Sequence, residues 1–446
     1  MTAPTIAPAT TSENAPETGA AETATAALSA RETLRLCTAG SVDDGKSTFV
    51  GRLLYDTKSV LADQVESMER SSADRGFDGM DLSLLVDGLR AEREQGITID
   101  VAYRYFATDK RTFILADTPG HVQYTRNTVT GMSTSQVVVL LVDARNGVVE
   151  QTRRHLNVAA LLGVRHVILG VNKIDLVDYD EATFRAIEAE FNEVAARLGI
   201  TDSVVIPISA LKGDNVVERS TNMDWYEGPT VLDTLETVPV ATGRADDLDL
   251  RFPIQYVIRE HASDYRGYAG RVKAGHVAVG DEVTLPGGRT STVTAIDTTD
   301  GPLGSDEAAR AGDSVVLRLA DDIDLARGDL IAGTQRPEEV REFAATAVVL
   351  TEKELRAGQM VKLRYGAALV KARVSSVDRV LDLDGVADVE APESAALNDI
   401  AFTTVQTQAE LPVEDYAARG AVGNFLLIDQ SSGNTLAAGF VGQRLR

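Results

Sequence analysis

One eight-residue stretch limits the folds open to this chain more than any other feature. Residues 40–47 read Gly-Ser-Val-Asp-Asp-Gly-Lys-Ser, the pattern of a phosphate-binding loop. The apolar run at 34–37 before it predicts a strand, and residues 46–55 after it predict a helix. Because such a loop places backbone N–H groups at a helix N-terminus, the sequence predicts an α/β domain built around this turn.

Short apolar runs alternate with longer amphipathic stretches between residues 34 and 242. This alternation is typical of a mostly parallel sheet flanked by helices, so we expect a doubly wound α/β fold. A helix is predicted at 181–198. The predicted strands are 34–37, 101–105, 112–116, 137–142, 167–171 and 204–208.

The pattern changes after a segment rich in small and acidic residues at 239–249. Short alternating runs between Gly and Pro turns replace the helical periodicity, which predicts two small antiparallel β-barrels. Their strands are expected at 251–258, 267–272, 281–285, 314–319, 359–365, 369–376, 400–406 and 423–428. The predicted organisation is a disordered tail at 1–30, an α/β domain at 31–244, and barrel domains at 245–338 and 339–446.

Charge and cysteine content restrict the class of protein. The 67 acidic and 44 basic residues give a net charge of −23, which disfavours non-specific binding of nucleic acid. No apolar run is long enough to cross a bilayer, and residues 1–30 lack the apolar core of a signal peptide. The one cysteine, Cys37, is expected to be a buried thiol in a reducing, cytoplasmic compartment, with a reactive thiol as the alternative.

The loop at 40–47 predicts specific roles for its side chains. Lys46 would place its charge on the β- and γ-phosphates of a nucleotide, and the Ser47 hydroxyl would bind Mg²⁺. The alternative is a structural turn that contains glycine. The expected phosphate site comprises Gly40, Ser41, Val42, Asp43, Asp44, Gly45, Lys46, Ser47 and Thr48.

Two further segments are expected to reach the same phosphates. Asp117 stands at the end of the strand at 112–116, where it would hold Mg²⁺ through water. Gly120 would let its N–H approach the γ-phosphate, so its loop must rearrange once that phosphate leaves. Thr98 is a further candidate magnesium ligand, although a Thr beside β-branched residues is also usual in a plain strand.

Recognition of guanine needs an acceptor for N1–H and N2–H₂ and a donor to O6. Asn172-Lys173-Ile174-Asp175 follows a predicted strand and supplies the Asp175 carboxylate as that acceptor. Asn172 would tie loops together, and the stem of Lys173 would lie along the base. Ser209-Ala210-Leu211 follows the next strand and would donate the Ala210 N–H to O6. The order of these motifs along the chain favours GTP over ATP.

Cleavage of the terminal phosphate depends on positioning a water molecule and neutralising charge. His121 follows Gly120 directly and is the candidate that orients this water, which completes a catalytic set with Lys46 and Thr98. The alternative is a histidine that only caps the following helix. His155, His166, His261 and His276 are expected to be surface or interface residues, and no Cys/His cluster supports a zinc site.

Residues 117–121, together with Gly-Ile-Thr at 96–98, resemble the translation-factor-type GTPases, whose members also carry two barrels. Longer stretches bring the chain closest to one family in that group, the large GTPase subunits of bacterial sulfate adenylyltransferase. The resemblance covers the chain beyond the tail. The stretches that carry it are 40–48, 85–106, 251–257 and 266–270.

This resemblance implies a GTPase that uses GTP and Mg²⁺. Its hydrolysis of GTP would drive adenylation of sulfate by ATP to adenosine 5′-phosphosulfate and pyrophosphate, on a separate small catalytic subunit that binds ATP and sulfate. Some members carry a kinase domain for adenosine phosphosulfate, which is not expected here because no second phosphate-binding loop occurs before Arg446. The alternative is an elongation factor that delivers aminoacyl-tRNA, for which the net charge is unfavourable.

Overall fold

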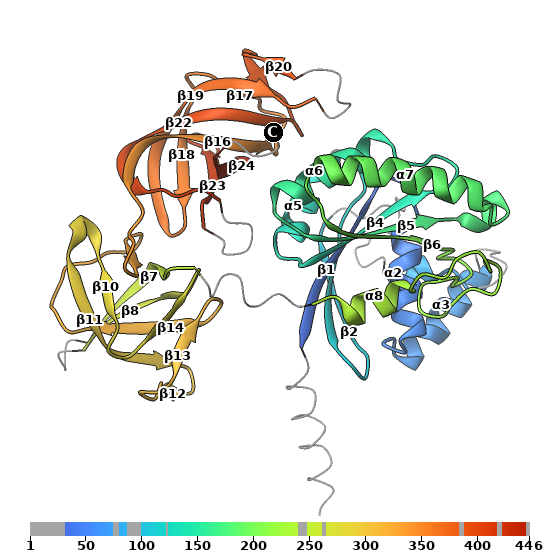
Figure 1. Ribbon diagram of the computed structural model, residues 1–446, viewed down its shortest axis with the longest axis horizontal. Coiled ribbons are helices and arrows are strands. Elements are labelled where there is room, and N and C mark those ends of the chain that lie inside the picture. Colours follow the sequence, from blue (N-terminus) through green and yellow to red (C-terminus); the bar gives the residue numbers. More distant parts are fainter. Residues whose placement is uncertain are drawn as a thin grey trace, which may run out of the picture.

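The computed structural model describes residues 32–74, 80–86, 100–121, 124–239, 248–260, 265–382, 388–416 and 422–442. An α/β domain forms one half of the molecule, and two β-barrels follow one another beside it (Figure 1). The predicted fold class, an α/β domain followed by two antiparallel barrels, is confirmed. Thr98, His261 and the N-terminal tail lie outside the described residues.

The sheet of the α/β domain has 6 strands in the order β2-β3-β1-β4-β5-β6. Its strands are parallel apart from β2, which pairs antiparallel with β3. Each of the predicted strands of this domain is present. The strands are β1 (Thr33–Gly40), β2 (Ala102–Ala107), β3 (Thr112–Asp117), β4 (Val137–Asp143), β5 (His166–Asn172) and β6 (Asp202–Pro207).

Helices cover both faces of this sheet (Figure 1). The predicted helices at 46–55 and 181–198 are confirmed with ends shifted by one residue. Short 3₁₀ turns occupy Leu82–Leu85 (η1) and Ile174–Val177 (η3). The α-helices are α2 (Lys46–Asp56), α3 (Ala62–Asp74), α5 (Thr125–Ser133), α6 (Glu150–Leu161), α7 (Glu181–Arg197) and α8 (Val231–Thr237).

The apolar runs of the α/β domain are continuous rather than alternating with polar residues, and the central strand β4 shows the reason. Every residue of β4 is buried, since helices cover both of its faces. Cys37 on the neighbouring β1 is fully buried, and this burial raises the pKa of its thiol to about 12. The thiol therefore stays protonated at neutral pH, which confirms the structural role over a reactive one.

The first barrel closes because β10 pairs with both β11 and β15. It has six strands, extended at one edge by β12 (Gly301–Pro302), and a separate pair of strands, β9 (His276–Ala278) and β13 (Ala308–Arg310). The strands of the barrel are β7 (Arg251–Arg259), β8 (Arg266–Arg271), β10 (Glu282–Thr284), β11 (Thr290–Thr298), β14 (Ser314–Leu319) and β15 (Leu330–Ala332).

The C-terminal barrel closes in the same way, through β18 and β19. It also has six strands, extended by β20 (Val389–Glu390), with β17 (Leu355–Arg356) and β21 (Ser394–Ala395) paired separately. Its strands are β16 (Glu339–Val349), β18 (Met360–Tyr365), β19 (Ala368–Val380), β22 (Ile400–Pro412), β23 (Asn424–Asp429) and β24 (Thr435–Val441).

The C-terminal barrel packs against the α/β domain. The Tyr416 hydroxyl donates to the Leu162 carbonyl oxygen at 3.0 Å, at the end of α6. Val348, Ile400 and Phe440 of the barrel join the same apolar cluster as the core of the α/β domain. Between the barrels, Arg251 donates to both oxygens of Glu414, at 2.8 and 3.1 Å. The three units are therefore linked by specific contacts as well as by chain connections.

Candidate nucleotide site

The predicted site residues follow the carboxyl ends of neighbouring strands. Gly40 ends β1, Asp117 ends β3 and Asn172 ends β5, while Ser209 follows β6 by two residues. Because these strands are parallel, their ends meet at one edge of the sheet. The structure thus brings together the motifs that the sequence separates by more than a hundred positions.

The phosphate-type loop is held by internal hydrogen bonds and by glycine. The backbone N–H of Ser41 donates to Asp44 Oδ2 at 2.5 Å, and Asp44 is buried. That burial raises the pKa of the Asp44 carboxyl, against the effect of the Ser41 hydrogen bond and the charge of Lys46. Gly45 has φ 88° at the N-cap of α2, and a Cβ there would overlap the Asn172 side chain, so only glycine fits.

Lys46 lies folded into this loop. Its Nζ donates to the carbonyl oxygens of Gly40 at 3.1 Å and Ser41 at 2.6 Å, and the residue is 8% exposed. Burial lowers the pKa of Lys46, while the charges of Asp44, Asp117 and Asp43 act to raise it. A Cβ on Gly120 would meet Lys46 and would lie 2.7 Å from the Gly40 carbonyl oxygen. Gly120 therefore has to be glycine for its loop to reach the ammonium group.

Asp117 is fully buried beside the same lysine. The Thr38 hydroxyl donates to Asp117 Oδ1 at 2.8 Å, and the Thr118 hydroxyl donates to the Thr38 carbonyl oxygen at 2.5 Å, which fixes the carboxylate. Ser47 is half-buried in the first turn of α2. A hydroxyl and a carboxylate suit Mg²⁺, which takes one or two carboxylates together with phosphate and water. Within the described ranges, no cluster of three His, Cys, Asp or Glu residues forms an all-protein metal site.

The Asn172 side chain joins the phosphate loop to the loop after β6. Its Nδ2 donates to the Asp44 carbonyl oxygen at 2.8 Å, and its Oδ1 accepts from the Ala210 backbone N–H at 2.9 Å. The Ala210 N–H, predicted to bind guanine O6, is engaged by Asn172 in this structure. Ala210 is buried, whereas Leu211 is 47% exposed.

Lys173 and Asp175, both predicted to contact the base, directly follow β5. Lys173 has φ 61°, and its Nζ donates to the Asp43 carbonyl oxygen and lies 3.0 Å from Asp143 Oδ2. The lysine stem therefore crosses from the end of β5 to the phosphate loop. Asp175, in η3, has a side chain that is 7% exposed, with Lys212 Nζ at 4.0 Å from its Oδ2.

Three residues at this site were not predicted, namely Thr38, which bonds Asp117, and the residues Arg52 and Asp143. Arg52 of α2 donates from Nε to the Ala210 carbonyl oxygen at 3.1 Å and from Nη2 to the Leu211 carbonyl oxygen at 2.5 Å. Nothing in the sequence distinguishes Arg52 from a solvent-facing helical arginine. Asp143 at the end of β4 bonds Arg145 and Lys173, and these cations hold the pKa of its carboxyl well below the usual range. Its place after the apolar run at 137–142 was a signal that could have identified it.

His121 is half-buried next to Gly120, at the start of the turn into α5. Its ring lies edge-on to Tyr124 with 6.0 Å between centroids, and its carbonyl oxygen accepts from the Tyr124 N–H at 2.9 Å. The histidine thus stands at the edge of the loop that approaches Lys46. This position is compatible with orienting a water molecule, and that role stays a prediction.

The prediction that His155 is a surface or interface residue was wrong. The residue is 1% exposed because it lies on the face of α6 that packs on the sheet. Its Nε2 lies 3.0 Å from Gln151 Nε2. Burial, together with the charges of Lys46 and Arg154, lowers the pKa of His155 to about 3, so the ring is neutral at physiological pH. His166 lies between the α/β domain and the C-terminal barrel and His276 is exposed, as predicted.

Comparisons with known proteins agree with this geometry. The Elongation factor Tu GTP binding domain family matches residues 31–240, and the GTP-eEF1A C-terminal domain-like family matches residues 342–442. The α/β domain is therefore a GTP-binding domain. In the described ranges, no helix has the length and hydropathy needed to cross a membrane.

Curated relatives match over most of the chain. The chain is 51% identical over 414 residues to the bifunctional enzyme CysN/CysC of Mycobacterium tuberculosis, covering 92% of this chain and 67% of that protein. It is 46% identical over 421 residues to the sulfate adenylyltransferase subunit 1 of Cellvibrio japonicus, covering 93% and 88%. Among solved structures, Sup35 complexed with GDP is similar, with a TM-score of 0.41, 24% identity, and coverage of 94% and 96%.

The Arg52 contacts generate a prediction. Arg52→Met keeps an unbranched stem but removes both hydrogen bonds to the 209–211 loop, so this loop is no longer held against α2. We expect the affinity for GTP to fall about tenfold, the effect of losing roughly 1.4 kcal/mol of hydrogen bonding. Titration calorimetry measures this change. The matched control is Arg70→Met, whose side chain is 71% exposed on α3, and equal affinities for both variants would contradict the role of Arg52.

Proposed function

Because the chain belongs to the sulfate adenylyltransferase subunit 1 family, we propose that it is the GTP-hydrolysing subunit of a sulfate adenylyltransferase. GTP hydrolysis here drives adenylation of sulfate by ATP to adenosine 5′-phosphosulfate and pyrophosphate. The observation that carries the proposal is 46% identity over 421 residues to a protein of that name, across the α/β domain and both barrels. The elongation-factor alternative is supported only by its matches at residues 31–240 and 342–442.

In this proposal the phosphates of GTP lie on residues 40–48 at the N-terminus of α2. Lys46 exchanges its carbonyl partners for phosphate oxygens, because a charged acceptor makes a stronger hydrogen bond than a neutral one. Asp175 accepts the guanine N1–H and N2–H₂ groups, and the Lys173 stem covers the base. The Ala210 N–H in the 209–211 loop, which Arg52 supports, would exchange its Asn172 partner for guanine O6.

Ser47, Thr98 and Asp117 are the residues proposed to hold Mg²⁺. The Thr38 hydroxyl orients Asp117 for this role, since it occupies Oδ1 and fixes the plane of the carboxylate. The bound ion would neutralise charge on the β- and γ-phosphates. The protein contributes Lys46 beside the same phosphates and a buried setting that strengthens these interactions.

Hydrolysis then requires a water molecule placed in line with the γ-phosphate. His121 is proposed to orient this water molecule. The Gly120 N–H is proposed to donate to the γ-phosphate, so that its loop rearranges when this phosphate leaves. Gly120 and His121 precede α5, which begins at Thr125, so their rearrangement would shift that helix. Such a shift would alter the surface offered to a partner subunit, which couples hydrolysis to a second reaction if both subunits share conformational states.

The partner is proposed to be a small catalytic subunit that binds ATP and sulfate and carries out the adenylyl transfer. The name "subunit 1" of the relatives indicates an assembly of more than one chain. Formation of the mixed anhydride of phosphate and sulfate from ATP is unfavourable, which is the physical reason for supplying a second nucleotide triphosphate. We place this assembly in the cytoplasm.

The proposed role of His121 is tested by substitution. In His121→Ala, hydrolysis of GTP should fall by about 10²- to 10⁴-fold because the attacking water is no longer positioned, while GTP affinity stays nearly unchanged. Single-turnover hydrolysis and equilibrium binding of a slowly hydrolysed GTP analogue measure the two quantities separately. The control is His276→Ala, at an exposed position of the first barrel. Collapse of analogue binding in His121→Ala would assign the histidine a structural role.

The overall proposal is tested by reconstitution. The chain is co-purified with the small subunit, and pyrophosphate release from ATP plus sulfate is measured with GTP, without GTP and with the slowly hydrolysed analogue. We expect release to depend on GTP hydrolysis, and to drop to the level without GTP when Lys46→Ala replaces the native chain. Pyrophosphate release that is the same in all arms would overturn the proposal, as would GTP-dependent capture of aminoacyl-tRNA by the isolated chain.

A further inference from the structure

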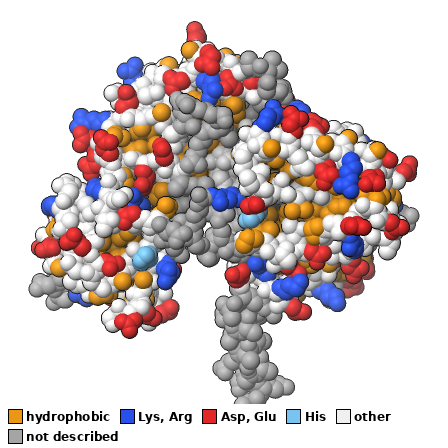
Figure 2. Space-filling view, viewed as in Figure 1, with side chains coloured by type: hydrophobic (Ala, Val, Ile, Leu, Met, Phe, Trp, Pro, Cys, Tyr) orange, Lys and Arg blue, Asp and Glu red, His pale blue; other side chains and the backbone are white. Residues whose placement is uncertain are grey.

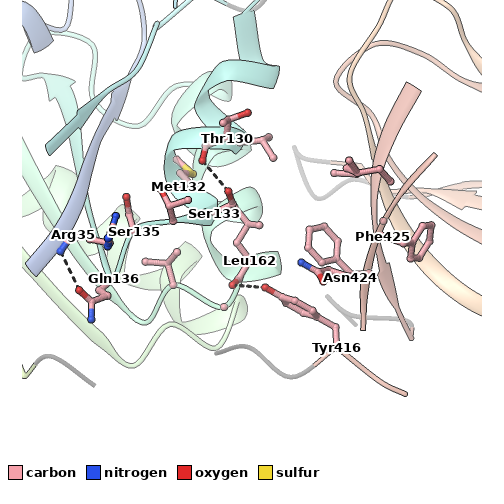
Figure 3. A pocket seen from close by; sticks show the side chains of 18 of the residues that line it. Arg35, Thr130, Met132, Ser133, Ser135, Gln136, Leu162, Tyr416, Asn424 and Phe425 are labelled. Carbon is pink, nitrogen blue, oxygen red and sulfur yellow. Dashed lines mark hydrogen bonds between the residues drawn. The ribbon is translucent and has the colours of Figure 1, made fainter. Parts of the chain in front are cut away.

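A cleft of about 770 Å³ lies between the α/β domain and the C-terminal barrel (Figure 3). One wall comes from the start of β1, the end of α5 and the turn before β5, and the other comes from β23 and β24. The hydrogen bond from Tyr416 to Leu162 crosses between the walls. This volume falls within the roughly 300–1,000 Å³ that is usual for small-molecule sites.

The cleft is separate from the nucleotide site. Arg35 and His166 lie at or near the amino ends of β1 and β5, whereas the phosphate and base loops follow the carboxyl ends of the same strands. A ligand in the cleft would therefore sit at the opposite edge of the sheet. The helix α5 connects the two sites, since it begins four residues after His121 and its end at Ser133 lines the cleft.

The charge of the lining is opposite to that of the whole chain. Arg35, Arg126, Arg165 and Arg271 line the cleft together with His166, and no Asp or Glu is among the described residues that line it. The chain as a whole has 67 acidic and 44 basic residues. Among the described residues, none of these four arginines lies within salt-bridge distance of a carboxylate. Figure 2 shows basic and histidine side chains at the edge of the α/β domain that faces the barrels, with an acidic side chain beside the histidine, and His166 Nδ1 lies 3.9 Å from Asp202 Oδ2.

The rest of the lining suits an organic anion rather than a bare ion. The Tyr416–Phe440 aromatic pair and the exposed Leu426 provide apolar surface on the barrel wall, whereas the Phe425 ring packs into the barrel core against Phe343. Thr130, Ser133 and Ser135 line the opposite wall, where their hydroxyls donate to backbone carbonyl oxygens of α5, so the arginines are the donors offered to a ligand. A pocket with an apolar wall and a few convergent donors is the usual composition of a small-molecule site, and guanidinium groups bind phosphate and sulfate in a bidentate manner.

We propose that this arginine-lined cleft is a second ligand site, which binds a nucleotide-sized organic anion bearing phosphate or sulfate. Occupancy would favour the docked arrangement of the α/β domain and the C-terminal barrel, because both walls contribute to the same ligand. The proposal stands independently of the proposed function, since it rests on the cleft alone. The described lining carries four arginines and no carboxylate, and a bound anion would offset this positive charge.

The experiment uses the full chain saturated with a slowly hydrolysed GTP analogue, so that the nucleotide site is filled. Titration calorimetry then follows the addition of ADP, inorganic pyrophosphate or sodium sulfate as separate arms. We expect ADP to bind, and to bind more tightly than either inorganic anion, because only ADP uses the aromatic wall. Comparable affinities for all three arms, or no binding of ADP up to millimolar concentration, would overturn the proposal.

Substitutions locate the binding. Arg35→Gln, in β1 of the α/β domain, and Arg271→Gln, at the end of β8 in the first barrel, should each weaken ADP binding about tenfold, the loss expected for one charged hydrogen-bonding partner. Arg197→Gln and Arg310→Gln, at exposed positions of α7 and β13, are the matched controls and should bind as the native chain does. Unchanged affinity for the GTP analogue verifies that each variant is folded. Equal loss in the controls and the cleft variants would exclude the cleft as the site.

A measurement on the native chain provides a test that requires no substitution. Binding through several arginines should weaken as sodium chloride rises from 50 to 300 mM, since salt screens the attraction. An ADP affinity that does not change over this range would contradict the proposal even if a variant fails to fold.

Discussion

The side chain of Asn172 is the interaction on which the nucleotide site depends. Its amide is buried, and both polar atoms are used, one on the Asp44 carbonyl oxygen and one on the Ala210 N–H. Loss of either partner would leave a buried polar group unsatisfied, at a cost of about 1–3 kcal/mol. The loop proposed to accept phosphates and the loop proposed to accept the base are therefore joined to each other by this one side chain. Arg52 supports the same arrangement from α2.

Contacts between the domains connect the nucleotide site to the C-terminal barrel and, through that barrel, to the first barrel. Gly120 lies against Lys46 and leads into α5, and the end of α5 lines the interface with the C-terminal barrel. That barrel is joined to the α/β domain by Tyr416 and to the first barrel through Glu414. Under the proposed function, a change at the γ-phosphate would pass through these packed elements to the C-terminal barrel, which is the physical requirement for coupling hydrolysis to chemistry on another subunit.

The sequence was sufficient for features that depend on local pattern. The continuous apolar run of β4 and the glycines at 40 and 45 each carry a direct physical meaning, namely burial on two faces and a turn that no Cβ allows. Contacts between distant segments could not be read in this way. Arg52 has the surroundings of a solvent-facing arginine until the fold places Ala210 and Leu211 against it, 158 and 159 positions away.

Contacts between distant segments also decide two features that the sequence did not predict, namely the burial of His155 and the arginine-lined cleft. Which face of α6 meets the sheet decides the burial of His155, and a single histidine carries no signal of that. The four arginines that line the cleft come from separate segments of the chain, and the chain is acidic overall. The positive charge of the cleft could therefore not be predicted from the sequence. These residues are Arg35, Arg126, Arg165 and Arg271.

The coupling of the two loops through Asn172 is tested most directly by binding measurements on Asn172→Ala with GTP and with inorganic tripolyphosphate. Tripolyphosphate has no base, so its affinity reports the phosphate loop alone. If Asn172 supports both loops, the substitution weakens tripolyphosphate and GTP by comparable factors. A variant that loses affinity for GTP but binds tripolyphosphate as the native chain does would show that Asn172 serves the base alone.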